Sequence, residues 1–129
     1  MESLLFSELT YKIRGIIFKV KKEVGLGHKE LVYHNALAEE FRQQNIRVES
    51  EKIIDIYYGE KKIGIYRPDF VIENKILLEI KVLPILGPRE ERQIWQYLKG
   101  SEYKLALLVN FGAEDIQIKR LVYDKAREK

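Results

Sequence analysis

The chain has 129 residues, of which 46% are hydrophobic and 33% are charged, a size and composition that suit one globular domain spanning residues 1–129. No apolar run approaches the ~20 residues of a membrane-spanning helix, and no basic leader precedes an apolar stretch, so we expect no membrane insertion and a cytoplasmic location. The lack of cysteine excludes disulfides and thiolate metal sites, whereas the net charge of +3 permits nucleic-acid binding without indicating it.

Two helices are predicted at the start of the chain. Residues 4–23 carry apolar side chains at a spacing of three to four, and Gly25 and Gly27 follow where this helix should end. A second helix is predicted from about His28 to Gln44. Its apolar positions include Leu31, Ala38 and Phe41.

From residue 48 the pattern becomes alternating and β-branched, which predicts strands. Strands over 48–58, 61–73 and 76–84 would be joined by tight turns into an antiparallel meander. Pro88 suits the first turn of a third helix, from about Arg89 to Lys99. Two further strands over 103–111 and 116–123 complete an α/β fold, in which helices flank a central mixed sheet.

Two charged residues interrupt the apolar strand over 76–84. Glu79 and Lys81 share one face of this strand, although both faces also carry apolar side chains. Burying a charge costs several kcal/mol unless it is paired or bound to a metal. A pair of opposite charges on a solvated sheet face is the ordinary alternative.

The presence of Asp69 nearby makes a solvated sheet face a less satisfactory explanation of Glu79 and Lys81. Asp69 lies in the preceding strand, where aspartate is disfavoured, and a two-residue turn at Asn74-Lys75 would place it across from Ile80 and within reach of Glu79. Converging carboxylates repel each other unless a cation lies between them, and Mg²⁺ or Mn²⁺ prefers such oxygen ligands. Lys81 would then point to the same place and could stabilise the charge of a phosphate.

These residues also resemble a known family. Asp69 followed by Glu79-Ile80-Lys81 is similar to the PD-(D/E)XK nuclease signature, and residues 27–33, GHKELVY, resemble the motif that names the GxxExxY family within that superfamily. Further similar segments follow in the family's order. They are Asn35-Ala36-Leu37, residues 65–70 (IYRPDF), residues 93–98 (QIWQYL) and residues 108–112 (LVNFG).

The resemblance implies a restriction-endonuclease-like core whose sheet combines the three-strand meander with two further strands. It implies that Glu30 adds an acidic group near the metal, through a water or as a further ligand, although an acidic residue at a helix start is usually solvated. It also implies that Gln93, with Tyr97 on the same helix face, lies beside the metal, although surface solvation and core packing are the ordinary roles of these residues.

We therefore expect a metal-dependent nuclease acting on phosphodiester bonds, with DNA as its substrate and a role in repair, recombination or defence. Asp69, Glu79 and the backbone carbonyl of Ile80 would hold Mg²⁺ or Mn²⁺. A catalytically silent binding module for nucleic acid or protein and a dimeric junction resolvase are the alternatives. Substrate contacts are expected from Tyr97, Lys29 and Arg92, and catalytic roles from Glu30, Asp69, Glu79, Lys81 and Gln93.

The two histidines are not expected to bind a metal. His28 and His34 are six residues apart, rather than the four of a helical zinc pair, and we expect both at the surface or at a helix end.

Overall fold

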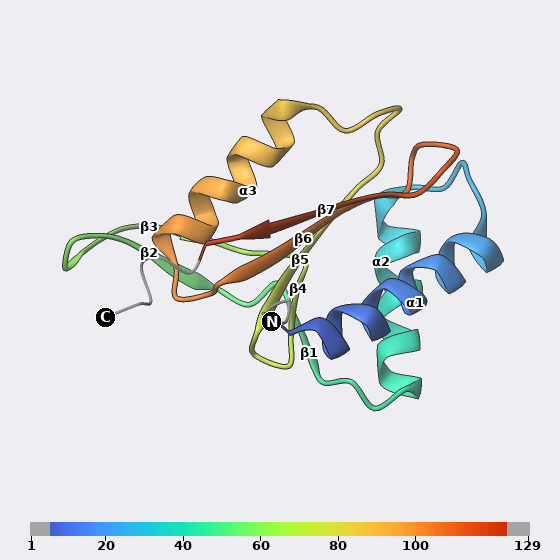
Figure 1. Cartoon of the computed structure of the whole chain (residues 1–129), viewed down its shortest axis with the longest axis horizontal. Coiled ribbons are helices and arrows are strands. Elements are labelled where there is room, and N and C mark those ends of the chain that lie inside the picture. The colour runs from blue at the N-terminus through green and yellow to red at the C-terminus, as the bar shows by residue number, and fades with distance from the viewer. Residues whose placement is uncertain (1–5, 124–129) are drawn as a thin grey trace, which may run out of the picture.

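The computed structural model describes residues 6–123, which form an α/β fold (Figure 1). No helix in this part of the chain is long and apolar enough to cross a membrane. The helices are α1 (Ser7–Val24), α2 (Glu30–Gln43) and α3 (Pro88–Gly100). The strands are β1 (Val48–Ser50), β2 (Ile54–Tyr58), β3 (Lys61–Tyr66), β4 (Phe70–Ile72), β5 (Ile76–Lys81), β6 (Leu105–Asn110) and β7 (Gln117–Val122).

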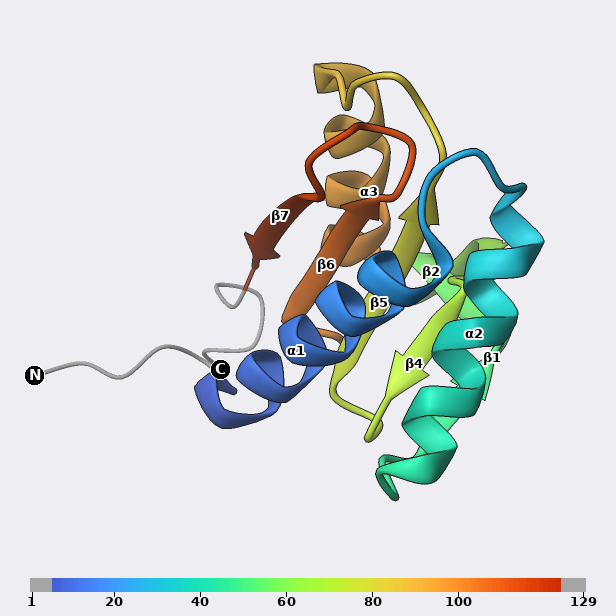
Figure 2. The same ribbon diagram turned by 90° about the vertical axis from the view of Figure 1, so that its right-hand side faces the viewer.

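Five strands form a central sheet in the order β1-β4-β5-β6-β7, with β5 and β6 parallel and the other neighbours antiparallel. Helices α1 and α2 cover one face of this sheet, while α3 and the separate β2–β3 hairpin cover the other (Figure 2). The predicted mixed sheet flanked by helices is therefore confirmed. Residues 4–5 of the first predicted helix lie outside the described residues.

Two of the predicted strands are each broken in the structure. The strand expected over 48–58 becomes β1 and β2, and that expected over 61–73 becomes β3 and β4. Glu51 has a left-handed backbone conformation, with φ at 52°, and Pro68 has no N–H to donate to a neighbouring strand. The breaks let β1 and β4 join the central sheet, while β2 and β3 pair only with each other.

The turn between β4 and β5 begins one residue earlier than predicted. Glu73 and Asn74 both have left-handed backbone conformations, with φ at 51° and 54°, and the N–H of Lys75 donates to the carbonyl of Ile72. The resulting register pairs Ile72 with Ile76 and Phe70 with Leu78. Continued by one residue, it places Asp69 opposite Glu79 rather than opposite Ile80.

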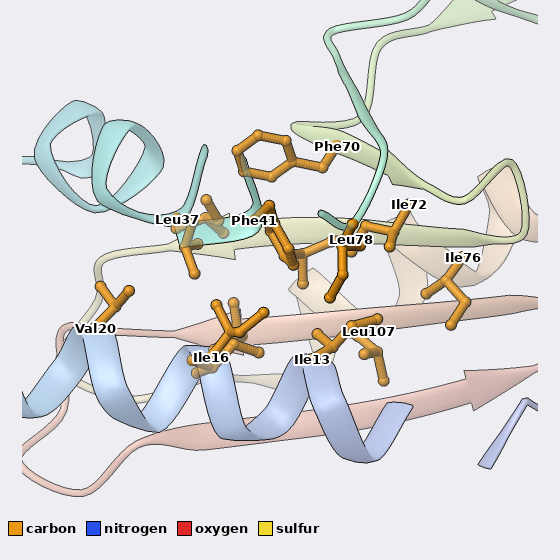
Figure 3. Close-up of a cluster of buried hydrophobic side chains, with 14 of the residues drawn as sticks. Ile13, Ile16, Val20, Leu37, Phe41, Phe70, Ile72, Ile76, Leu78 and Leu107 are labelled. Atoms are coloured by element: carbon orange, nitrogen blue, oxygen red, sulfur yellow. The ribbon is translucent and has the colours of Figure 1, made fainter. Parts of the chain in front are cut away.

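The larger core lies between α1, α2 and the sheet (Figure 3). The spacing of three to four predicted an apolar face for the first helix, and four residues of that face are buried in α1: Ile13, Ile16, Ile17 and Val20. In α2 the buried face consists of Tyr33, Leu37 and Phe41. Leu31, predicted to be an apolar face position, is 66% exposed because it lies about 120° around the helix from the centre of that face.

Candidate active site

Asp69 and Glu79 lie opposite each other, where β4 begins and β5 approaches its end. The backbone N–H of Asp69 donates to Glu79 Oε1 at 2.8 Å, and the backbone N–H of Ile80 donates to Asp69 Oδ2 at 2.7 Å. Each side chain thus binds the backbone of the strand across from it. One oxygen of each carboxylate is used in this way, which leaves its second oxygen for a further ligand.

Burial destabilises the ionised form of both carboxyl groups. Loss of surrounding water is the largest cause of the raised pKa of Asp69. Burial, followed by the negative charge of Asp69, raises the pKa of Glu79 to about 7. Two carboxylates therefore repel each other where little water screens them, and a cation between them would relieve both effects.

The side chain of Lys81 lies beside the carboxylate pair, one repeat of the strand beyond Glu79. Its positive charge acts on Asp69 and Glu79, and also on Glu30 at the first position of α2. Although the side chain of Glu30 is exposed, loss of water around its carboxyl group and then the charge of Asp69 raise its pKa. The structure thus brings these four predicted residues into one electrostatic neighbourhood.

Helix α3 borders this neighbourhood from the other side. Lys81 also acts on Glu90, a residue of the first turn that the sequence did not single out, whose carboxylate accepts the backbone N–H of Gly87 at 2.8 Å. Gln93 is exposed and lies between Glu90 and Tyr97 on the same helix face. Tyr97 is half-buried and stacks on Tyr66, with ring centroids 3.9 Å apart. A substrate contact by Tyr97 stays a prediction, because the structure shows it in packing.

The two basic residues expected to contact substrate are both exposed. Lys29 is exposed immediately before α2, and Arg92 is exposed on α3. Neither makes a side-chain hydrogen bond or an ion pair with another residue of 6–123, so both ammonium and guanidinium groups are open to solvent. Their roles in binding substrate stay predictions.

Tyr33 anchors the loop that leads to Glu30. It is fully buried, stacks on Phe111 at 4.6 Å between ring centroids, and donates a hydrogen bond from its hydroxyl to the carbonyl of Gly25 at 2.5 Å. The hydroxyl also accepts the backbone N–H of His28. The hydrogen bonds of Tyr33 therefore fix the α1–α2 loop and, with it, the position of Glu30 at the start of α2.

Asn110 and Gly112 anchor the chain that leaves Lys81. The Asn110 amide accepts the backbone N–H of Leu83 at 2.8 Å and donates to the carbonyl of Leu83 at 2.9 Å, and it also bonds Gln117. A Cβ at Gly112 would overlap the backbone of Leu83, so only glycine allows this approach. The asparagine and glycine of the LVNFG segment thus hold the β5–α3 loop rather than contacting the carboxylate pair.

His34 is the clearest departure from expectation in this region. The sequence predicted a surface or helix-end residue, which is correct for the exposed His28. In His34, however, both ring nitrogens are buried without a hydrogen-bond partner among residues 6–123, and the ring stacks on Phe70 at 4.3 Å between centroids. His34 is therefore half-buried rather than fully at the surface, because α2 turns its ring inward, one turn after Glu30. Only the three-dimensional packing reveals this.

The donor set fits a hard divalent cation that keeps several waters. Within residues 6–123 no group of three or more histidine or acidic side chains is arranged to hold a metal. Asp69 and Glu79 alone supply two carboxylates, and Mg²⁺ commonly binds through only one or two carboxylates plus water. With the carbonyl of Ile80 as a further oxygen ligand, these residues could hold Mg²⁺ or Mn²⁺, whereas zinc would lack its usual nitrogen and sulfur ligands.

Comparisons with known proteins identify the fold and the superfamily of the chain. The chain is similar to the crystal structure of an alkaline exonuclease from Laribacter hongkongensis, with a TM-score of 0.53 and 14% sequence identity. The similarity covers 98% of this chain and 74% of the exonuclease chain, which supports the fold. No curated protein matches the chain. The family model of the PD-(D/E)XK nuclease superfamily matches residues 7–121, and the chain therefore belongs to this superfamily.

Proposed function

We propose that this protein is a divalent-metal-dependent nuclease that hydrolyses phosphodiester bonds in DNA, and that it belongs to the GxxExxY branch of its superfamily. The observation that carries the proposal is the carboxylate pair of Asp69 and Glu79, flanked by Lys81. The Glu79 carboxylate accepts the backbone N–H of Asp69, and the Asp69 carboxylate accepts the backbone N–H of Ile80. The anchoring of the α1–α2 loop by Tyr33, beside Glu30, supports the assignment to that branch.

Each residue of the proposed site would have its own role in the reaction. Asp69, Glu79 and the carbonyl of Ile80 would hold Mg²⁺ or Mn²⁺, with Glu30 acting through a water. When bound, such an ion neutralises negative charge on the phosphate and makes a water more acidic. Lys81 offers a fixed ammonium to the charge that develops on the phosphate oxygens.

Gln93, on α3, would be the last of the proposed catalytic residues. Its amide would donate to a phosphate oxygen or accept from a water, and its position on the same helix face as Glu90, on which Lys81 acts, supports this role. The exposed Lys29 and Arg92 would contact the phosphate backbone, which fixes position without reading sequence.

Cleavage assays with matched variants test the proposal. The wild-type protein with Mg²⁺ or Mn²⁺ is incubated with single-stranded, double-stranded and branched DNA and with RNA, beside Asp69→Asn and Lys81→Ala. Asp55→Asn and Lys12→Ala, which lie away from the carboxylate pair, are the controls. We expect each site variant to lose roughly 100-fold or more of the activity and each control to keep it.

Each other result has a defined meaning. Cleavage that survives in chelator, or in Asp69→Asn, would refute the proposed metal site. Tight binding of DNA without cleavage by the wild-type protein would indicate a non-catalytic binding module instead. Preferential cleavage of branched DNA by a dimer would indicate a junction resolvase, and the lengths of the products distinguish endonuclease from exonuclease.

A further inference from the structure

Three buried side-chain atoms within residues 6–123 have no hydrogen-bond partner, and all three lie near the carboxylate pair. They are the two ring nitrogens of His34 and the hydroxyl oxygen of Tyr66. Buried polar groups are normally satisfied, as Asn110 is by its bonds to Leu83 and Gln117. Such unsatisfied groups destabilise a fold, and native proteins tend to keep them where function requires them.

Tyr66 faces Glu79 from the end of β3. Its side chain is 6% exposed, and its ring is held against the ring of Tyr97 with an angle of 9° between their planes. Burial and then the charge of Glu79 raise the pKa of this phenol, so the hydroxyl keeps its proton and can act toward the carboxylate only as a donor. The hydroxyl is close enough to Glu79 to lower the pKa of that carboxyl, although the contact lacks the geometry of an ordinary hydrogen bond in this structure.

His34 lies on the opposite side of the pair. It follows Glu30 by four residues and so shares its side of α2, and its ring packs flat on Phe70, the residue after Asp69. A charge on this imidazole would act on Asp69 and on Glu30. Stacking on Phe70 fixes the plane of the ring, and the two nitrogens lie in that plane.

We propose that His34 and Tyr66 are positioning residues of the carboxylate pair. His34 positions Asp69 and Glu30, whereas Tyr66 positions Glu79. The hydrogen bonds of His34 and Tyr66 form when a divalent cation and its waters bind. The proposal rests on the proposed function for its cation. One oxygen of each carboxylate is already held by a backbone N–H. Polar groups beside the carboxylates can orient the remaining oxygens and the waters of the cation, and such outer partners commonly tune metal binding.

The proposal predicts an unusual pair of effects in single variants. Tyr66→Phe and His34→Phe each remove an unsatisfied polar group while keeping a ring for stacking. The melting temperature of the metal-free protein should therefore stay constant or rise by about 2–4 °C. The affinity for Mn²⁺, measured by calorimetry without substrate, should nevertheless fall by roughly 10-fold or more.

Two exposed residues provide matched controls, and a conservative variant provides a rescue. Tyr58→Phe and His28→Phe make the same chemical changes at exposed positions and should leave Mn²⁺ affinity unchanged. His34→Asn retains a side-chain N–H and should recover part of the affinity that His34→Phe loses. It also serves if the larger phenylalanine prevents folding.

The outcomes separate this inference from the proposed function. If the wild-type protein binds Mn²⁺ and either phenylalanine variant binds it equally well, that residue has no positioning role. A variant that loses affinity only in proportion to a lower melting temperature would show a structural role and would equally overturn the proposal. If the wild-type protein itself binds no Mn²⁺, the proposed function fails and this inference fails with it.

Discussion

Replacing Glu79 by glutamine should stabilise the metal-free protein at alkaline pH, although it removes a residue of the proposed site. The pKa of Glu79 is raised to about 7 in the folded protein from an ordinary value of 4.5. A carboxyl group with a raised pKa binds its proton more tightly in the folded state. The resulting stability is fully present below pH 4.5 and is lost as the pH rises through about 7.

The structure gives the size of the effect. A difference of about 2.5 between the folded and unfolded pKa values of Glu79 corresponds to roughly 3 kcal/mol. Glutamine has no charge to bury and can still accept the N–H of Asp69. At pH 8.5 the variant should therefore exceed the wild type in unfolding free energy by up to about 3 kcal/mol, or roughly 10 °C in melting temperature, and at pH 4.5 by less than about 1 kcal/mol.

Urea denaturation in chelator at these two pH values measures the difference, with the exposed Glu60→Gln as the control. Taking the variant relative to the wild type removes the contribution of other titrating groups. An equal stability difference at both pH values, or a less stable variant at pH 8.5, would show that Glu79 carries no destabilising buried charge. Added Mn²⁺ should then stabilise the wild type and not the variant, since only a bound ligand shifts folding.

Other perturbations give contrasting results. Gly112→Ala should lower the unfolding free energy by about 2 kcal/mol or more, because the added Cβ overlaps the backbone of Leu83. Gly15→Ala, in open space on α1, should raise the unfolding free energy by about 0.5–1 kcal/mol. Thermal melts of the two variants measure this contrast. Asn110→Leu should cost about 2 kcal/mol or more by leaving the backbone of Leu83 unsatisfied, and urea denaturation checks this. Mn²⁺ affinity should fall as the pH drops below about 7, by up to 10-fold per pH unit, because the cation competes with the proton of Glu79; calorimetry between pH 5.5 and 8.5 would show no such slope if this carboxylate were not a ligand.

The central sheet was predictable because its strands carry a strong local signal. Residues 76–82 are apolar on both faces of the strand apart from two charges, and these properties follow from the alternation of side chains alone. The inward face of α1 likewise follows from its spacing of three to four. Local patterns of this kind do not depend on which element packs against them.

Features that depend on backbone conformation or on distant partners could not be predicted in the same way. The left-handed residues Glu73 and Asn74 move the β4–β5 turn by one position, and that shift changes the residue opposite Asp69. Pro68 gave a visible sign of irregularity, but only the pairing of β1 with β4 shows that the strand is divided. Nothing in the sequence indicated that the ring nitrogens of His34 are buried, because the ring packs on Phe70, which is distant in sequence.

The short motifs that resemble a family are individually weak but meet a single structural requirement. Three loops gather at one end of the sheet, and a side chain from another part of the chain fixes each of them (Figures 1 and 2). Tyr33 holds the α1–α2 loop, Asn110 the β5–α3 loop, and Lys21 the β6–β7 loop through the carbonyls of Phe111 and Ala113. Because Tyr33 and Asn110 each contact a loop and not the carboxylate pair, loss of Tyr33 should displace Glu30 and loss of Asn110 should displace Lys81, without removing either charge. In the proposed nuclease, preorganisation of this kind would lower the cost of aligning a phosphate, which would explain why residues without chemical reactivity belong to the same signature as those with proposed catalytic roles.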